Sequence, residues 1–180
     1  MQISHDFGVD IEVYAEKGIM NPFPLLDCCP NCGCHGPGNI HRHGYYSRYG
    51  IQDEQTWLLM ICRYRCQICE ITISILPDFL IPYFQYTLWM ILKHVKQLLE
   101  KKKERALSHQ LCRYHLNRFL HYQNWVHTFF MEESKEPERY HIKKAINYVV
   151  MILDFGESPF FRRSWGHLQS YFMARSVYHK

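Results

Sequence analysis

The sequence predicts an α+β protein in which a small cysteine-bearing module of three strands precedes a helical domain. Two Cys-x-x-Cys pairs, Cys29 with Cys32 and Cys66 with Cys69, flank two segments of strand-like composition. From Thr87 onward the apolar residues recur with a helical period of about 3.6 instead of about two. Of the 180 residues, 47% are hydrophobic and 21% are charged, which excludes a disordered chain. We therefore expect three parts: an N-terminal strand or arm at 1–26, the cysteine module at 27–86 and the helical domain at 87–180.

The N-terminal part carries a short alternating stretch. Val9, Ile11 and Val13 alternate with less apolar neighbours, a pattern that predicts a half-buried strand. The segment Asn21–Pro24 contains two prolines and should end this strand.

The cysteine module continues as a hairpin and a third strand. Strand-like segments run from about residue 39 to 49 and from about 56 to 65, and residues 50–55 between them begin with Gly and carry acidic side chains that suit a turn. Ile71–Ile75 follows Cys69 as a third short strand. Three short strands bury little apolar surface, so this module needs a further source of stability.

Four helices are predicted in the C-terminal half. Thr87 suits the N-cap of the first helix, which the charged run extends to Arg105. Ser108 suits the N-cap of a second helix that reaches about Glu132. A break at 134–138 precedes a third helix over about 139–154, and a shorter fourth helix is predicted over 164–174.

Charge and hydropathy narrow the functional classes. No apolar run approaches the roughly 20 residues that cross a bilayer, and the first residues lack the pattern of a secretory signal, so we expect a cytoplasmic protein with no membrane partner. Its thiols should stay reduced, which favours metal ligation over disulfides for the eight cysteines. Residues 1–92 hold five Lys and Arg against nine Asp and Glu, whereas residues 93–180 hold sixteen against eight. The basic half favours an anionic partner, nucleic acid first, although solvated lysines on helix surfaces give the same pattern.

The spacing of the cysteine pairs predicts a metal site. The 33 residues between the pairs form the expected hairpin, which returns the chain so that four thiolates can meet. Four thiolates complete a closed tetrahedral Zn²⁺ site, which is structural because no position is left for water. A redox Cys-x-x-Cys is disfavoured because neither pair opens a helix after a strand. Cys28 or Cys34 can replace a member of the first pair, and the predicted ligands are Cys29, Cys32, Cys66 and Cys69.

Four blocks along the chain carry a family resemblance. In this order, Cys29–Cys32, His41–Arg48, Arg63–Cys69 and Ile75–Tyr83 resemble the N-terminal zinc ribbon of bacterial transposase-related proteins. In that family a helix-turn-helix segment follows the ribbon, and the resemblance covers about residues 28–130. It implies a mobile-element protein that binds Zn²⁺ and DNA, with a helix-turn-helix-like segment in the helical domain.

The chain departs from the larger transposases in its carboxylates. It reaches Lys180 without an acidic catalytic domain, and Asp53, Asp78 and Asp154 lack the alternating strands and helices that would assemble them. Motifs for phosphate loops and for serine nucleophiles are also missing. We therefore expect an accessory or regulator rather than an enzyme. The alternative is a protein-interaction module that docks onto a larger nucleoprotein complex, and the aromatic residues near the C-terminus leave a homodimer open.

Two surfaces are predicted to contact nucleic acid, DNA first. On a helix from Ser108, a turn of about 100° per residue gathers one polar sector whose side chains suit base edges. Basic residues before this helix suit phosphates, and Arg and Tyr on the hairpin suit phosphates and stacked bases. Solvated amphipathic faces would produce the same patterns. The residues are Gln110, Arg113, Asn117 and His121 in the sector, Lys101, Lys102, Lys103 and Arg105 before it, and Arg42, Tyr46, Arg48 and Arg65 on the hairpin.

Overall fold

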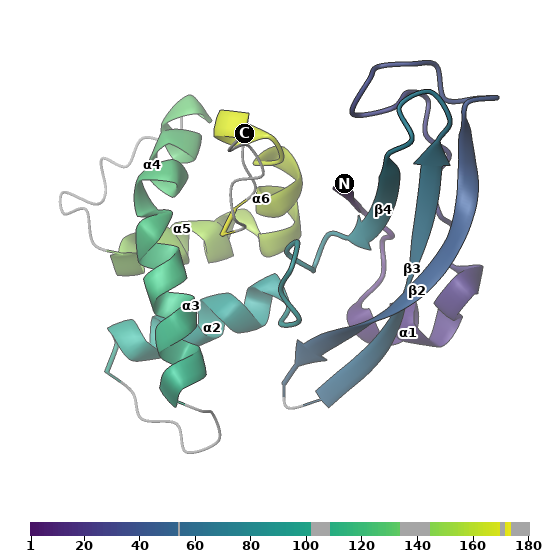
Figure 1. The fold of residues 1–180 in the computed structure, drawn as a ribbon. Helices are drawn as coiled ribbons and strands as arrows, with labels where there is room; N and C mark the ends of the chain where they lie inside the picture. The colour runs from purple at the N-terminus through teal and green to yellow at the C-terminus, as the bar shows by residue number, and fades with distance from the viewer. Residues whose placement is uncertain (54, 102–108, 134–144, 170–171, 174–180) are drawn as a thin grey trace. The chain divides into compact units, whose positions relative to one another are not determined.

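The computed structural model describes residues 1–53, 55–101, 109–133, 145–169 and 172–173 (Figure 1). These residues form a mixed α+β fold, which confirms the predicted fold class. The chain divides into two compact units, unit 1 (Met1–Gln85) and unit 2 (Tyr86–Lys180). Among the described residues, no helix is long and apolar enough to cross a membrane.

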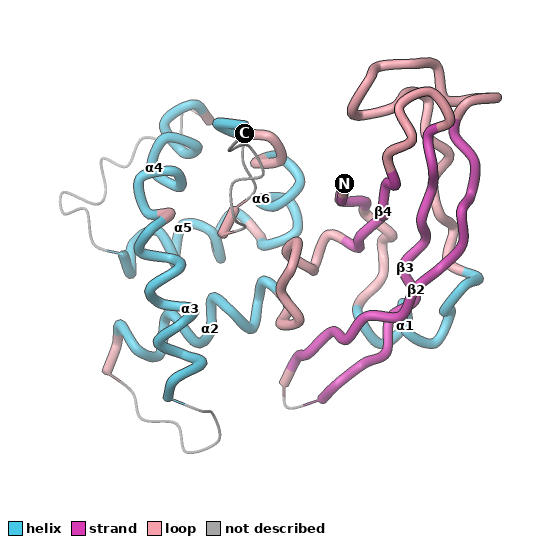
Figure 2. The backbone as a smooth tube through the Cα atoms, viewed as in Figure 1, coloured by secondary structure: helices cyan, strands magenta, loops and turns pink. Residues whose placement is uncertain are grey.

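Unit 1 is built on a four-stranded sheet with the order β1–β4–β3–β2 (Figure 2). β2 and β3 form the predicted antiparallel hairpin, and β4, antiparallel to β3, is the predicted third strand. The sheet has four strands rather than three, because β1 adds to it in parallel with β4 and places Gln2 opposite Ser74. This pairing joins segments far apart in the sequence, so no local pattern reveals it. The strands are β1 (Gln2–His5), β2 (Ile40–Gln52), β3 (Gln55–Cys66) and β4 (Thr72–Pro77).

The strand predicted around Val9–Val13 is wrong, because the structure has helix α1 (Ile11–Lys17) there. The Asp10 carboxylate caps the helix by accepting a hydrogen bond from the Val13 N–H at 2.9 Å. Ile11 and Tyr14 are buried, and their spacing of three residues puts them on one helix face. The alternating residues therefore fit a helix as well as a strand, and packing decides between them. The short 3₁₀ helix η1 (Gly18–Met20) follows.

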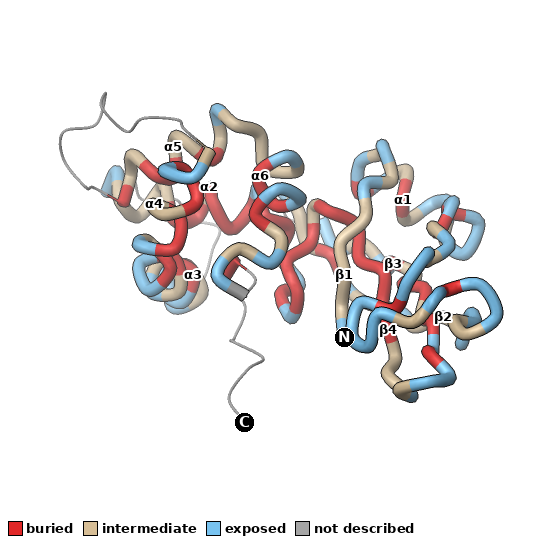
Figure 3. The backbone as a smooth tube through the Cα atoms, turned by 90° about the horizontal axis from the view of Figure 1, so that it is seen from above, coloured by how far each residue is buried: buried red, intermediate tan, exposed pale blue. Residues whose placement is uncertain are grey.

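The core of unit 1 lies along the central strands and α1. Leu59 and Ile61 from β3 and Ile73 and Ile75 from β4 are fully buried, and β4 is buried along most of its length (Figure 3). The Tyr14 hydroxyl donates a hydrogen bond to the carbonyl of Met60 at 2.9 Å, which ties α1 to β3.

Arg48 on β2 holds the end of unit 1 in place. Its guanidinium donates to the carbonyl of Ile81 at 2.9 Å and to that of Phe84, and the N–H of Ile51 donates to the carbonyl of Gln85 at 2.8 Å. The segment after β4 is thereby tied to β2.

In unit 2 the first predicted helix is α2 (Leu88–Leu99), and the Thr87 hydroxyl accepts from the Met90 N–H at its start as expected. The helix ends at Leu99, which is before the predicted end at Arg105. The second predicted helix is divided at Tyr122 into α3 (His109–His121) and α4 (Gln123–Glu132). Ser108, predicted to cap it, lies outside the described residues.

The last predicted helices are only partly right. α5 (Ala145–Phe155) matches the described part of the third, whose expected start at 139 lies outside the described residues. The fourth, predicted over 164–174, is wrong in its described part: α6 (Glu157–Arg163) ends at Arg163 with Ser164 as its C-cap, and the 3₁₀ helix η3 (His167–Gln169) follows. Gly156 before α6 and the positive φ of Leu168 inside η3 break the chain into these short pieces.

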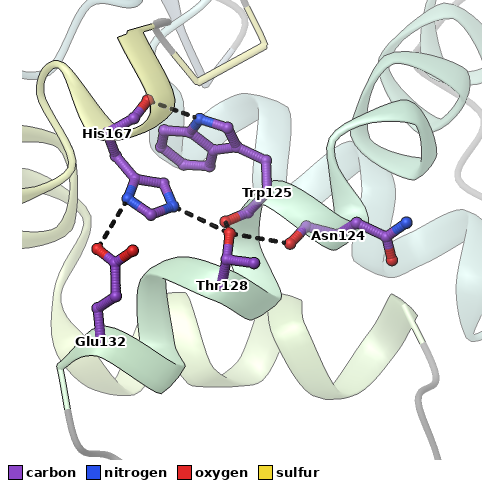
Figure 4. A network of polar contacts seen from close by, with 5 residues as sticks. All are labelled: Asn124, Trp125, Thr128, Glu132 and His167. Atoms are coloured by element: carbon purple, nitrogen blue, oxygen red, sulfur yellow. Dashed lines mark hydrogen bonds and ion pairs between the residues drawn. The ribbon is translucent and has the colours of Figure 1, made fainter.

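Aromatic side chains fill the core of unit 2, and a polar network fastens η3 to α4 (Figure 4). The Trp125 indole N–H donates to the carbonyl of His167 at 3.0 Å. The His167 ring contacts the Thr128 hydroxyl at 3.0 Å and the Glu132 carboxylate at 3.2 Å. The Thr128 hydroxyl also donates to the carbonyls of Asn124 and Trp125 in its own helix. The network therefore joins His167 of η3 to side chains that α4 holds in place. Buried aromatic residues of the core include Phe119, Trp125, Phe129, Phe130, Phe160 and Phe172.

Candidate metal centre

Two tight turns position the cysteine pairs. In the loop before β2, the N–H of Gly33 donates to the carbonyl of Cys29 at 2.8 Å, and Gly33 has a φ of 70°, a conformation that favours glycine. Cys66 is the last residue of β3, and its N–H donates to the carbonyl of Ile71 at 3.0 Å across the second turn. The hairpin therefore brings the end of β3 back to the first pair, as its length predicted.

The loop of the first pair is packed so closely that it needs a further glycine. A Cβ on Gly36 would lie 1.7 Å from the carbonyl oxygen of Leu26, which is backbone and has no freedom to move aside. The Gly36 N–H also donates to the carbonyl of Asp27 at 2.7 Å. Close packing of two backbone segments thus fixes the loop that carries Cys29 and Cys32.

The four sulfur atoms of the two pairs form one cluster. The Sγ atoms of Cys29, Cys32, Cys66 and Cys69 all lie within 4.8 Å of one another, so this group can hold a metal ion. The Cys29–Cys69 distance is 3.7 Å and the Cys32–Cys66 distance is 3.8 Å. Zn–S bonds of about 2.3 Å in a tetrahedron require sulfur atoms about 3.8 Å apart, so these two sulfur–sulfur distances fit a tetrahedral zinc site.

Backbone N–H groups favour the thiolate form at the second pair. The N–H of Cys69, directed at the Cys66 sulfur, lowers the pKa of Cys66 to about 6. The N–H of Ile71 lowers the pKa of Cys69 in the same way. Metal ligation requires deprotonated sulfur, so the turn prepares these two residues for it.

The remaining cysteines differ in their surroundings. Cys34 Sγ lies 3.5 Å from Cys66 Sγ, although Cys34 is outside the group of four. Cys28 is exposed and forms a β-bridge with His35. Cys62 is buried in the core of unit 1, and Cys112 is buried on α3, as expected for a core cysteine.

The hairpin carries basic side chains at the end where Ile40 pairs with Cys66, which is its metal end. Ile40 pairs with Cys66, His41 with Arg65 and Arg42 with Tyr64, so Arg42 and Arg65 lie within two residue positions of the candidate metal ligand Cys66. Both are exposed, and Arg65 lies 3.7 Å from the Glu70 carboxylate.

Two further predicted hairpin residues are less open. Tyr46 is half-buried, and the Arg63 guanidinium lies 5.3 Å from the centre of its ring. Arg63 belongs to the same hairpin surface and is itself half-buried. Arg48 donates to backbone carbonyls within unit 1, and burial lowers its pKa, so its guanidinium is already engaged by the protein.

On α3 the predicted polar sector faces outward. Gln110, Arg113, Asn117 and His121 are all exposed. Lys101 is exposed just after α2, whereas Lys102, Lys103 and Arg105 lie outside the described residues. The buried face of α3 consists of Cys112, His115 and Phe119.

A buried histidine pair was missed by the sequence analysis. The Nδ1 atoms of His94 on α2 and His115 on α3 are 2.8 Å apart, and the rings are stacked with an interplanar angle of 8°. The Tyr86 ring lies edge-on to both. Burial, together with the neighbouring His94, lowers the pKa of His115 to about 4. In the sequence, the signal that could have revealed this pair is a histidine within the apolar stripe of each of the two helices.

Residues 29–119 match the model of a family described as a domain of unknown function, DUF6431. The chain belongs to this family. The match begins at the first metal-ligand candidate and ends within α3, so it includes all four cysteines and the exposed sector up to Asn117. No curated protein and no solved structure matches the chain.

Proposed function

We propose that this protein of the DUF6431 family is a zinc-dependent DNA-binding protein, related to mobile-element transposases, that acts as an accessory or regulator without catalysis of its own. The proposal combines the four-cysteine centre of unit 1 with two surfaces that carry basic and amide side chains.

Zinc is the metal that suits the centre best. Four clustered sulfur atoms, with Cys29–Cys69 and Cys32–Cys66 separations of 3.7 and 3.8 Å, favour Zn²⁺ over the oxygen-seeking ions Mg²⁺ and Ca²⁺. A closed set of four thiolates is structural, and structural zinc contributes folding free energy on the order of 10 kcal/mol. Such a contribution suits unit 1, whose sheet is small and whose first cysteine loop has no helix or strand to hold it.

The exposed sector of α3 is the observation that carries the DNA-binding proposal. α3 buries Cys112, His115 and Phe119 and leaves Arg113 and Asn117 in solvent. A helix that reads the major groove needs this division, because one face must pack while the other approaches base edges. Arg pairs with guanine and Asn or Gln with adenine, so the exposed residues are of the reading type.

The metal end of the hairpin is the second surface. Arg42 and Arg65 are exposed beside the register position of Cys66, where they can contact phosphates. Because these arginines lie next to a ligand, loss of the metal should disturb this surface together with the centre.

A DNA-binding experiment with variants of α3 tests the proposal. A preferred sequence is first selected from a random library with the zinc-loaded protein. Arg113→Ala and Asn117→Ala should each weaken binding to that sequence by about 1–3 kcal/mol and binding to random DNA much less. Arg162→Ala, an exposed arginine on α6, is the matched control and should leave the sequence preference unchanged. If Arg113→Ala and Asn117→Ala both bind the selected sequence as the wild type does, α3 is excluded as the reader.

Salt separates DNA binding from the alternative of docking onto a nucleoprotein complex. The alternative draws support from large exposed apolar side chains on unit 1, since Met20 is 80% and Leu25 83% exposed. Affinity carried by phosphate contacts must fall steeply as salt rises, whereas apolar docking changes little. A salt-independent association with a nucleoprotein complex, combined with no affinity for free DNA, would favour docking.

A further inference from the structure

A fifth sulfur atom lies against the four-cysteine centre. Cys34 Sγ is 3.5 Å from Cys66 Sγ, closer than Cys29 Sγ is to Cys69 Sγ at 3.7 Å or Cys32 Sγ to Cys66 Sγ at 3.8 Å. A closed tetrahedral site needs no fifth thiolate. The position of Cys34 therefore calls for another role.

The backbone holds Cys34 in this position. Its carbonyl accepts a hydrogen bond from the Cys29 N–H at 2.9 Å, and the next residue, His35, forms a β-bridge with Cys28. Cys34 is partly exposed and Cys32 beside it is exposed, so a small solute in water can reach the sulfur cluster. Cys34 is thus a fixed and accessible thiol in contact with a ligand.

We propose that Cys34 and Cys66 form an oxidation site for a hydroperoxide, at which a Cys34–Cys66 disulfide forms and the metal is released. This inference rests on the proposed zinc centre, because the released ion is the one that Cys66 holds. The contact between the two sulfur atoms is the observation that selects this pair.

The chemistry balances with hydrogen peroxide as the oxidant. The Cys66 thiolate attacks one peroxide oxygen, the O–O bond breaks, and Cys66 becomes a sulfenic acid while the other oxygen leaves as hydroxide and is protonated to water. The Cys34 sulfur then attacks the Cys66 sulfur, the S–S bond forms, the S–O bond breaks, and the leaving hydroxide takes up the Cys34 proton as water. Two thiols lose two electrons, and one peroxide is reduced to two molecules of water.

Metal release follows from the loss of one thiolate. A disulfide sulfur is a poor ligand for zinc, so the centre keeps Cys29, Cys32 and Cys69 only, and an open three-cysteine site binds more weakly than a closed four-cysteine site. Thiol reductants reverse the step by exchange, after which zinc can bind again.

The test treats the full-length, zinc-loaded protein with hydrogen peroxide. Released zinc is followed with a chromogenic chelator, and the disulfide is located by alkylation and peptide mass spectrometry. We expect one zinc released per chain, a crosslink between the peptides of Cys34 and Cys66, and recovery of the bound zinc after addition of dithiothreitol and Zn²⁺.

Two variants make the test specific. Cys34→Ser should bind zinc with the wild-type stoichiometry, lose the crosslink and release zinc several-fold more slowly. Cys28→Ser, which removes an exposed thiol from the same loop, should behave as the wild type does. A crosslink that omits Cys34, an unchanged rate of release in Cys34→Ser, or a Cys34→Ser protein that binds no zinc would each overturn the inference. Those results leave zinc binding by the wild type intact, whereas a wild-type protein that takes up no zinc contradicts the proposed function itself.

Discussion

At the scale of single residues, the pair His94 and His115 shows how burial fixes a protonation state. Both side chains are almost fully buried, and their Nδ1 atoms are 2.8 Å apart. Two neutral rings share this contact when one donates and the other accepts, whereas two imidazolium ions would place two donors and two charges face to face. Folding therefore selects neutral rings, and protonation opposes the packing of α2 against α3.

The pair predicts that acid weakens unit 2. The pKa of His115 is about 4 in the folded protein against 6.5 for an ordinary histidine, so between these values the unfolded chain binds a proton that the folded chain does not. The stability is fully present above about pH 6.5 and falls as the pH drops toward 4, by roughly 3 kcal/mol in total. Urea unfolding followed by helical circular dichroism between pH 7 and pH 4.5 measures this fall.

A second histidine on the same helix supplies the control for this prediction. His121→Gln removes an exposed histidine from α3 and serves as the matched control. His115→Gln should reduce the slope by up to one proton, whatever its own stability. Equal slopes in the two variants would contradict the assignment of the acid sensitivity to His115.

At the scale of elements, the parts that local sequence specifies were predictable. The spacing of the cysteines, the hairpin β2–β3 and the Thr87 cap of α2 each depend on residues close together in the chain. β1 was not predictable, because its pairing with β4 is a contact between distant segments. The alternation from Val9 to Val13 fits a helix and a strand equally, and only the packing of Tyr14 against β3 decides for α1.

The site was predictable to the same extent. The two Cys-x-x-Cys pairs identify the candidate ligands, since each turn presents its own two sulfur atoms. The contact of Cys34 with Cys66 depends on how the first loop folds back, and the role of Arg48 depends on where the segment after β4 lies. Neither position follows from spacing along the chain.

Arg48 joins β2 to the segment at residues 81–84, so its removal should destabilise unit 1. Arg48→Ala removes a partly buried guanidinium that donates to two carbonyls, and we expect a loss of about 2 kcal/mol in the free energy of unfolding of the zinc-loaded protein. Arg65→Ala on the neighbouring strand, which removes an exposed side chain, should cost no more than about 0.5 kcal/mol. Urea unfolding compares the two, and equal stabilities would show that Arg48 does not hold the segment.

At the scale of the whole molecule, the fold of unit 1, the proposed DNA binding and the proposed oxidation all involve the proposed zinc centre. Domains of this size are stable by only about 5–15 kcal/mol, and structural zinc supplies on the order of 10 kcal/mol, so the proposed zinc centre predicts that the fold of unit 1 depends on the metal. The basic end of the hairpin lies at the residue positions next to Cys66, and the oxidation site includes Cys66 itself. We therefore expect the proposed DNA binding by the hairpin and the proposed sensitivity to peroxide to require an occupied centre.

Metal analysis of the full-length protein, purified without chelator, tests this central claim most directly. We expect one Zn²⁺ per chain in the wild type and in Cys112→Ser, whose thiol lies in the core of unit 2, and little or no zinc in Cys66→Ser. The ligand variant should also lose the fold of unit 1, whereas Cys112→Ser should lose packing only. A wild-type protein that holds well under one zinc per chain, or a Cys66→Ser protein that holds as much as the wild type, would contradict the account.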